Sequence, residues 1–367
     1  MSNYQYKGVN IGNWLVLEKW MSPDLFSGVD AEDEYHFTRM LPKDQYLERI
    51  TRHRKEYITE HDFAAMATLG YNAVRIPIPF FIFGDRPPYA GCIEQLDDAF
   101  DWAEKYGLKI LIDLHTVPGS QNGFDNGGLC GVCRWAETPE EVDFVLNLLE
   151  KLAKRYGKRP GLLGIQPLNE PISGEGTWEQ AGIMNRYPSL EPDLVKGSAP
   201  IRPAFLRQFY IDAYRRIRPH LEEDKYFVFH DAFRIWDWKD FMQEEEFHHV
   251  ALDAHLYLSI AEQMGAEKTM EGYAAACQEL FAKQIEETSQ YFEVICGEWC
   301  LDSSYTKGLT DPEEKAACYK KLAVMQQAAW EKGFGSFFWS YKLTNPNSDV
   351  ACWDVAKCHG HRWIENK

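Results

Sequence analysis

Eight short apolar runs recur along the chain, and most of them are bounded by glycine, proline or charged residues. Such runs are typical of buried β-strands. They lie at residues 8–17, 72–78, 109–115, 162–169, 226–230, 250–256, 292–298 and 336–343. The stretches between them carry helical spacing of apolar residues or helix start signals, so strands and helices are predicted to alternate.

Helix start signals precede three of these intervening stretches. Thr59 is followed three residues later by Asp62, and Thr138 and Asp311 each stand directly before a proline. Thr and Asp side chains accept hydrogen bonds from the first turn of a helix, and proline fits its first position. A further stretch, 93–106, has apolar residues at helical spacing and ends before a glycine, which predicts another helix.

Eight alternating strand–helix units are enough to close a parallel sheet into a ring. The sequence therefore predicts an α/β fold of the (β/α)8 TIM barrel type, built as a single catalytic domain over residues 1–367. In such a barrel the active site is formed where the strands end, so polar residues at strand exits are expected to converge.

Two of the predicted strands end in a carboxylate. The run 162–169 leads into Glu170 and Pro171, and the run 292–298 ends at Glu298. Asn-Glu-Pro also makes an ordinary turn, so the first tip alone would be weak evidence. Because the design recurs, we expect the two glutamates to face each other from opposite sides of the barrel mouth, as an acid and a nucleophile.

The charge and composition of the chain restrict the kinds of molecule that it can bind. The formal net charge is −17, and no basic run offsets it, which disfavours nucleic acid and anionic membranes. No apolar segment is long enough to span a membrane, and no secretory leader is recognised at the amino terminus. Nine cysteines, an odd number, fit reduced thiols better than a disulfide framework. We therefore expect a cytoplasmic protein.

Aromatic residues make up 14% of the chain, and 12 of them are tryptophans. We expect about half of these aromatic residues to lie in the core. The remainder would offer flat faces on which the C–H faces of sugar rings pack.

Five motifs carry a resemblance to a known family: GVNIGNWLVLE at 8–18, VRIPI at 74–78, IDLH at 112–115, PGSQNGFDN at 118–126 and LNEP at 168–171. They resemble glycoside hydrolase family 5, and most closely its fungal exo-β-1,3-glucanases. The resemblance covers nearly the whole chain, and the motif at 118–126 is its sharpest part.

The resemblance implies that Glu170 is the acid/base and Glu298 the nucleophile of a retaining glycosidase. It also implies a set of substrate-binding residues: Glu18, Arg75, His115, Asp125, Asn169, His255, Tyr257 and Trp339. Retention needs a carboxylic acid and a carboxylate about 5 to 5.5 Å apart. We expect burial to raise the pKa of Glu170, and Arg75 to favour the ionised form of Glu298.

Glu18 and Asp125 match positions that hold the non-reducing terminal sugar, which favours action at chain ends. For Glu18 a solvated surface charge is the alternative, because Lys19 replaces the proline that usually follows. His115 and His255 have an alternative as ordinary core histidines.

The expected function is that of an exo-acting β-glycosidase that releases glucose from β-1,3-gluco-oligosaccharides or short β-glucosides by double displacement. One alternative is a β-glycosidase or transglycosidase that acts on plant or lipid glycosides or β-1,4-linked oligosaccharides. Another is a non-catalytic sugar-binding barrel. The oligomeric state is not fixed by the sequence.

We expect no cofactor and no metal. A zinc site formed by Cys130, Cys133, Cys352 and Cys358 is an alternative, although a lone C-x-x-C is weak evidence and free thiols are favoured.

Overall fold

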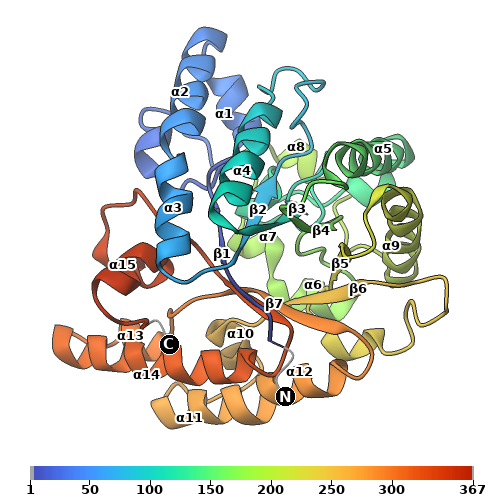
Figure 1. Ribbon diagram of the computed structural model, residues 1–367. Coiled ribbons are helices and arrows are strands. Elements are labelled where there is room, and N and C mark those ends of the chain that lie inside the picture. The colour runs from blue at the N-terminus through green and yellow to red at the C-terminus, as the bar shows by residue number, and fades with distance from the viewer. Residues whose placement is uncertain (1–3, 366–367) are drawn as a thin grey trace.

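The protein is described by a computed structural model over residues 4–365, and its eight strands close into a parallel barrel (Figure 1). Each strand pairs with the next, and β8 pairs with β1. The strands are β1 (Tyr6–Asn10), β2 (Ala73–Ile78), β3 (Lys109–Leu114), β4 (Leu162–Gln166), β5 (Tyr226–His230), β6 (Val250–His255), β7 (Glu293–Trp299) and β8 (Gly335–Phe338). The predicted (β/α)8 barrel is confirmed.

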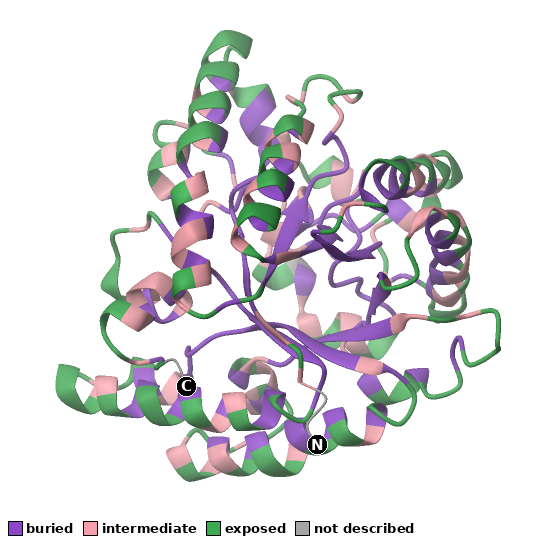
Figure 2. Cartoon of the chain, in the orientation of Figure 1, coloured by how far each residue is buried: buried purple, intermediate pink, exposed green. Residues whose placement is uncertain are grey.

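Helices surround the barrel, and their outward faces are exposed whereas the strands are buried (Figure 2). The longer helices are α2 (Lys43–Glu56), α3 (Glu60–Thr68), α4 (Ile93–Tyr106), α5 (Pro139–Tyr156), α9 (Pro203–Ile217) and α14 (Pro312–Trp330). The shorter ones are α1 (Glu34–Met40), α6 (Glu175–Ala181), α7 (Ile183–Arg186), α8 (Pro192–Val195), α10 (Leu258–Gln263), α11 (Met270–Ala275), α12 (Ala282–Thr288), α13 (Ser304–Lys307) and α15 (Val355–Gly360). A π-helical segment, Ala276–Phe281, joins α11 to α12.

The predicted helix boundaries are confirmed at the residues that signalled them. Thr59 and Asp62 form a capping box at the start of α3. The Asp311 side chain accepts a hydrogen bond from the backbone N–H of Glu313 at the start of α14. Gly107 ends α4 in the left-handed conformation that glycine adopts without strain.

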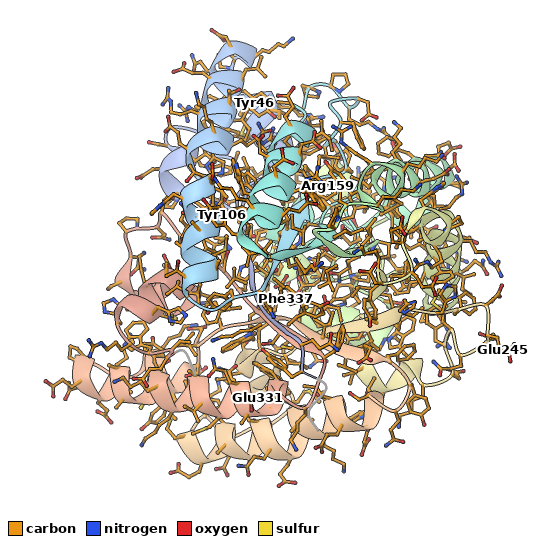
Figure 3. All side chains as sticks on the ribbon, viewed as in Figure 1. Tyr46, Tyr106, Arg159, Glu245, Glu331 and Phe337 are labelled. Atoms are coloured by element: carbon orange, nitrogen blue, oxygen red, sulfur yellow. The ribbon has the colours of Figure 1, made fainter. Side chains whose placement is uncertain are left out.

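The barrel interior is layered. An apolar layer is formed by Ala73, Leu111, Leu163, Val228, Ala251, Ile295, Phe334 and Phe337, of which Phe337 is labelled in Figure 3. Side chains alternate along a strand, so the residue two positions later also points inward. On three strands that residue is charged: Arg75 on β2, Asp113 on β3 and Asp253 on β6. The strands thus lead from an apolar floor into a polar mouth.

Three strands end well before the apolar runs that predict them. The strand ends at Asn10 in the run 8–17, at Gln166 in the run 162–169 and at Phe338 in the run 336–343. The remaining apolar residues, Ile11 and Leu17 among them, are buried in irregular segments. A buried loop shows the same apolar pattern as a buried strand, so the pattern overestimates strand length.

The expectation that the fourth and seventh strands lie on opposite sides of the ring is wrong. The order of strands places β5 and β6 between them. Glu170 and Glu298 therefore approach across part of the mouth, with residues of β6 between them.

Candidate active site

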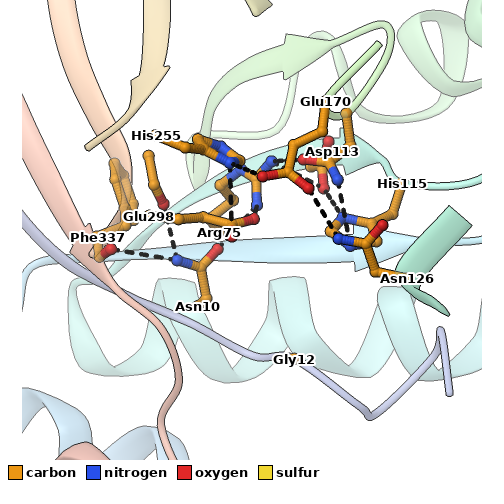
Figure 4. A network of polar contacts seen from close by, with 12 residues as sticks. Asn10, Gly12, Arg75, Asp113, His115, Asn126, Glu170, His255, Glu298 and Phe337 are labelled. Carbon is orange, nitrogen blue, oxygen red and sulfur yellow. Dashed lines mark hydrogen bonds and ion pairs between the residues drawn. The ribbon is translucent and has the colours of Figure 1, made fainter. Parts of the chain in front are cut away.

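Glu170 and Glu298 meet at a single histidine nitrogen. Nδ1 of His255 lies 2.7 Å from Oε1 of Glu170 and 3.5 Å from Oε2 of Glu298 (Figure 4). Those two oxygens are therefore at most 6.2 Å apart, the sum of the two distances. Carboxyl pairs of retaining glycosidases lie about 5 to 5.5 Å apart, and those of inverting enzymes lie about 6.5 to 9.5 Å apart. The geometry fits a retaining pair.

Glu170 follows the end of β4 in a left-handed backbone conformation with a φ of 43°. Such a conformation costs a non-glycine residue on the order of 1–3 kcal/mol and is found at functional sites. The preceding residue, Asn169, ties this turn to the barrel, because its backbone N–H donates to the carbonyl of Leu114 at 3.0 Å. The strained turn aims the carboxylate into the mouth.

Glu298 is turned inward by an irregularity of β7. Ala254 pairs with Cys296, but His255 pairs with Glu298, so Gly297 is an extra residue in this register. A Cβ on Gly297 would lie 2.1 Å from Oδ1 of Asp253, so only glycine leaves room for that carboxylate. Ile295 points into the barrel, and strict alternation would have turned Glu298 outward.

Both oxygens of Glu298 are held. Nη1 of Arg75 donates to Oε1 at 2.9 Å, and the hydroxyl of Tyr257 donates to Oε2 at 2.7 Å. Arg75 also donates to Oδ1 of Asn169 at 2.7 Å, and Asn10 accepts from the same guanidinium at 3.0 Å. The arginine thus fixes the carboxylate and the amide in one orientation, and its expected contact with Glu298 is present.

A second tier of polar groups supports these residues. Nδ1 of His115 bonds to Asp113 at 2.6 Å, and its Nε2 lies 3.3 Å from Nδ2 of Asn169. Its ring is stacked on Trp339, with centroids 5.6 Å apart. On the other side, Asp253 bonds to Nε2 of His255 at 3.3 Å. His115 and His255 are therefore part of the site, although both are fully buried.

The titration of the two glutamates differs from the sequence-based expectation. Burial opposes ionisation of Glu170, but the hydrogen bond and positive charge of His255 outweigh it and lower the pKa of Glu170 to about 2. The pKa of His255 is raised well above its ordinary value: burial lowers it, but the charges of Glu298 and Asp253 prevail. The prediction of a raised pKa for Glu170 is wrong for the free enzyme, in which His255 carries the proton.

The pKa of Glu298 is raised, chiefly because the carboxyl is buried, and the negative charge of Glu170 adds to the effect. Arg75 and His255 lower it, but not enough to cancel burial. The ion pair with Arg75 therefore reduces, without removing, the cost of ionising this carboxylate.

A cavity of about 330 Å³ opens above these groups. Six of the ten residues expected in the site line it: Glu18, Asp125, Glu170, Tyr257, Glu298 and Trp339. Of the other four, Arg75, His115 and His255 contact lining residues, and Asn169 bonds to Arg75 and directly precedes Glu170. The structure thus brings all ten together around one cavity.

Glu18 is a buried carboxylate and not a solvated one, because only 4% of its surface is exposed. Its Oε2 accepts a hydrogen bond from the indole N–H of Trp20 at 2.8 Å. Its Oε1 is buried and has no hydrogen-bond partner within residues 4–365. Burial and the charge of Asp125 raise the pKa of Glu18 well above its ordinary value. An unpaired acceptor at the cavity wall is suited to a hydroxyl donor.

Sequence reasoning missed part of the site. Asn126, inside the sharpest motif, donates from Nδ2 to Oε2 of Glu170 at 2.8 Å. Trp20 and Trp353 line the cavity and pack edge to face at 5.5 Å. Asn126 could have been found from its place beside Asp125, whereas Trp20 lies in a turn and Trp353 ends a short 3-10 helix, and neither segment carries a clear pattern.

Residues of the segment 173–203 also line the cavity. They are Thr177, Gln180, Ala181, Arg186 and Tyr187, contributed by α6, α7 and the residue after α7. Phe124 and Phe233, from loops, and Ile260, from α10, line the cavity as well.

The cysteines do not assemble into a metal centre. All nine are free and buried. Within residues 4–365, the two groups with metal-ligand geometry are Glu170, His230 and His255, and Glu223, His248 and His249, neither of which contains cysteine. The zinc alternative for Cys130, Cys133, Cys352 and Cys358 has no support in this arrangement.

The chain matches known proteins along most of its length. The family profile for cellulase (glycosyl hydrolase family 5) matches residues 44–196. A glucan 1,3-beta-glucosidase of Candida oleophila is 33% identical over 389 residues, which cover 93% of this chain and 84% of the relative. That of Blumeria graminis is 34% identical and covers 81% of this chain, which spans 65% of that relative's length.

Solved structures share the fold. The rutinosidase from Aspergillus niger superimposes with a TM-score of 0.75 at 22% identity, and 98% of each chain is covered. A crystal structure of AoRut gives a TM-score of 0.80 at 20% identity, covering 99% of this chain and 97% of the other.

A closed (β/α)8 barrel with two buried glutamates at the ends of its fourth and seventh strands is the framework of an enzyme that cleaves glycosidic bonds. The protein is a glycoside hydrolase. On the similarity to the glucan 1,3-beta-glucosidases, the chain belongs to glycoside hydrolase family 5. Within the described residues, no helix is both long and apolar enough to cross a membrane.

Proposed function

We propose that the protein is a retaining, exo-acting β-glucosidase that releases glucose from the non-reducing end of β-1,3-gluco-oligosaccharides or short β-glucosides. The observation that carries the proposal is the approach of Glu170 and Glu298 to the same nitrogen of His255, within 6.2 Å of each other. The names of the relatives, glucan 1,3-beta-glucosidases, supply the substrate class.

In the first step Glu298 attacks the anomeric carbon while Glu170 protonates the departing glycosidic oxygen. Arg75 and Tyr257 hold the two oxygens of the nucleophile, so its orientation is fixed before substrate arrives. The proton that Glu170 must give resides on His255, 2.7 Å away, in the free enzyme. Its transfer to Glu170 becomes favourable as Glu298 gives up its negative charge to the new ester bond, because that charge stabilises the imidazolium.

In the second step Glu170, now ionised, takes a proton from water, and the resulting hydroxide attacks the anomeric carbon of the glucosyl ester. The bond to Glu298 breaks and leaves the carboxylate, and glucose departs with its original β configuration. Asn126 donates to the Oε2 oxygen of Glu170 at 2.8 Å and supports the ionised form in this role.

Exo action is supported by the acidic wall of the cavity. Glu18 presents a buried, unpaired oxygen, and Asp125 lines the same cavity. Two acceptors at one end favour the hydroxyls of a terminal sugar over a continuing chain, because each additional sugar would leave the carboxylates unpaired.

Product analysis tests the proposal. The purified enzyme is expected to release only glucose from laminari-oligosaccharides, one unit at a time, with the β-anomer formed first in a proton NMR time course. Glu298→Ala should retain its melting temperature and lose activity by a factor of at least about 10³. Release of the α-anomer, of longer oligosaccharides first, or wild-type rates in Glu298→Ala would refute the assignment.

A second candidate is a glycosidase or transglycosidase for β-glucosides with a bulky apolar aglycone. The observation that favours it is a set of apolar residues in the lining of the cavity: Ile172, Phe233, Ile260 and Met264. Met264 is 52% exposed, so an apolar aglycone bound at this part of the cavity would cover it. Comparison of kcat/KM for laminaribiose with that for an aryl or alkyl β-glucoside separates the two candidates.

We also propose that the protein works in a reducing compartment such as the cytoplasm. All nine cysteines are buried free thiols, and burial raises the pKa of Cys92 to about 11 and that of Cys133 to about 12, so these thiols stay protonated and unreactive. Fractionation of the source cells tests this, and recovery of the active enzyme only from the medium would contradict it.

A further inference from the structure

His230 is a buried histidine of the active site that the mechanism above does not use. It is the last residue of β5, and none of its surface is exposed. Its ring packs edge-on against the ring of His255, with centroids 4.4 Å apart and planes at 88°. His230, His255 and Glu170 each offer one ligand atom within 4.8 Å of the others. The histidine therefore contacts the pair that holds the proton of the acid.

The backbone fixes the proton of this ring. The N–H of Ala232 donates to Nδ1 of His230 at 3.0 Å, so the neutral ring carries its proton on Nε2. Ala232 and Phe233 adopt left-handed conformations with φ values of 52° and 57°, which turn the chain back onto the ring. Two strained residues in succession hold one tautomer in place.

The Nε2–H group that results is buried and has no hydrogen-bond partner within residues 4–365. A buried unpaired donor costs about 1–3 kcal/mol, so its retention calls for an explanation. The ring also stays neutral: burial and the positive charge of His255 lower the pKa of His230 to about 3. The charged and titratable groups that face it are Glu170, Asp231, Asp253, His255 and Arg75.

We propose that His230 is a positioning residue whose neutral Nε2–H group lowers the proton affinity of the Glu170–His255 pair and orients Glu170 as the acid. The inference rests on the proposed function. The positive end of an N–H dipole stabilises ionised Glu170 if it faces the carboxylate, and it destabilises protonated His255 if it faces that ring. Both arrangements make the pair a stronger acid, so the sign of the effect does not depend on which group the donor faces.

The test compares two aryl β-glucosides in wild type, His230→Phe and His230→Gln. Phenyl β-glucoside needs its leaving group protonated, whereas 2,4-dinitrophenyl β-glucoside does not. His230→Phe removes the donor and should lower kcat/KM for phenyl β-glucoside about three- to tenfold, with the dinitrophenyl substrate changed less than about twofold. The basic limb of its pH profile should move to higher pH. His230→Gln, which keeps a neutral donor, should restore the wild-type profile.

Tyr210→Phe is the matched control, because Tyr210 donates to the carbonyl of His230 at 2.9 Å and supports β5 without facing the site chemistry. It should move neither the leaving-group ratio nor the pH profile. Equal losses on both substrates in His230→Phe with an unmoved basic limb, or no change at all, would overturn the proposal. If His230→Phe does not fold, His230→Leu takes its place. A wild-type enzyme that cleaves neither glucoside would instead refute the proposed function.

Discussion

At the scale of single residues, His255 decides how the two glutamates share protons. It lies between them, and both Glu170 and Glu298 depend on its charge. Because these groups lie in contact, the protonation of one changes the pKa of the others. The free enzyme therefore stores the catalytic proton beside the acid.

The pH dependence of kcat/KM follows from these shifts. Glu298 must be ionised, and burial raises its pKa above the ordinary value of 4.5, so activity should be lost as the pH falls through a value above 4.5. The acid needs the proton that His255 carries, and the pKa of His255 is raised well above 6.5 by neighbouring carboxylates, although burial opposes this. The basic limb should therefore lie above pH 6.5. A pH profile on phenyl β-glucoside checks both limbs, and full activity at pH 4 would contradict the assignment.

Glu18→Gln separates stability from function. Burial and Asp125 raise the pKa of Glu18 in the folded state, so the folded protein binds this proton more tightly than the unfolded chain. Its contribution to stability is thus favourable at low pH and is lost as the pH rises from the unfolded pKa through the folded one. At pH 7 the neutral glutamine should raise Tm by about 2 °C or more, while kcat/KM falls.

The control for this variant is pH itself. The difference in Tm between wild type and Glu18→Gln should shrink as the pH approaches 4, where both side chains are neutral. If the difference in Tm does not change with pH, or if Glu18→Gln has the lower Tm at pH 7, then ionised Glu18 does not destabilise the folded protein.

Sequence reasoning found the ten side chains that surround the cavity, because each belongs to a recognisable motif or a predicted strand end. It could not find the partners that set their titration. Asp253 and His230 stand on strands whose apolar pattern hides them. Asp253 acts on the pKa of His255 and His230 on that of Glu170, and both effects depend on distances between strands. The pKa direction expected for Glu170 is wrong because the positive charge of His255, which Glu298 and Asp253 stabilise, could not be inferred from its place in the sequence.

At the scale of elements, the irregular register of β7 is the feature that makes the site. Gly297 adds one residue opposite β6, and this turns Glu298 toward the mouth. Asn10 binds the carbonyl of Gly297 at 2.8 Å and steadies the irregular segment. Hydrophobic patterns locate a strand but not its pairing register, so this feature could not be predicted.

Gly297→Ala tests the role of that register. The added Cβ would lie 2.1 Å from the Asp253 carboxylate, which in turn bonds His255 and Gln166. Relief of the clash must displace β6 or β7, at an expected cost of about 1–3 kcal/mol in the free energy of unfolding. Both the free energy of unfolding measured in urea and kcat/KM should fall. Gly176→Ala is the control, because nothing lies within 4 Å of a Cβ at that position. Equal stability of the two variants would contradict the account.

At the scale of the whole molecule, one ring of strands collects residues that are far apart in sequence. Glu170 and Glu298 are separated by 128 positions and still share one histidine. The residues behind the net charge of −17 lie largely on helices and loops, as does Glu245 at the edge of the molecule in Figure 3. The charged groups at the barrel mouth are buried and pair with one another. The alternation of strands and helices was enough to predict this ring.

Trapping the covalent intermediate tests the assignment of Glu298 as the nucleophile most directly. The enzyme is incubated with 2,4-dinitrophenyl 2-deoxy-2-fluoro-β-glucoside, whose fluorine slows hydrolysis of the glucosyl ester more than its formation. Mass spectrometry of the intact protein and its peptides should then show one fluoroglucosyl group per chain, attached to Glu298. Inactivation without a mass change, or the sugar attached to Glu170 or any other residue, would contradict the assignment of Glu298 as nucleophile and Glu170 as its acid.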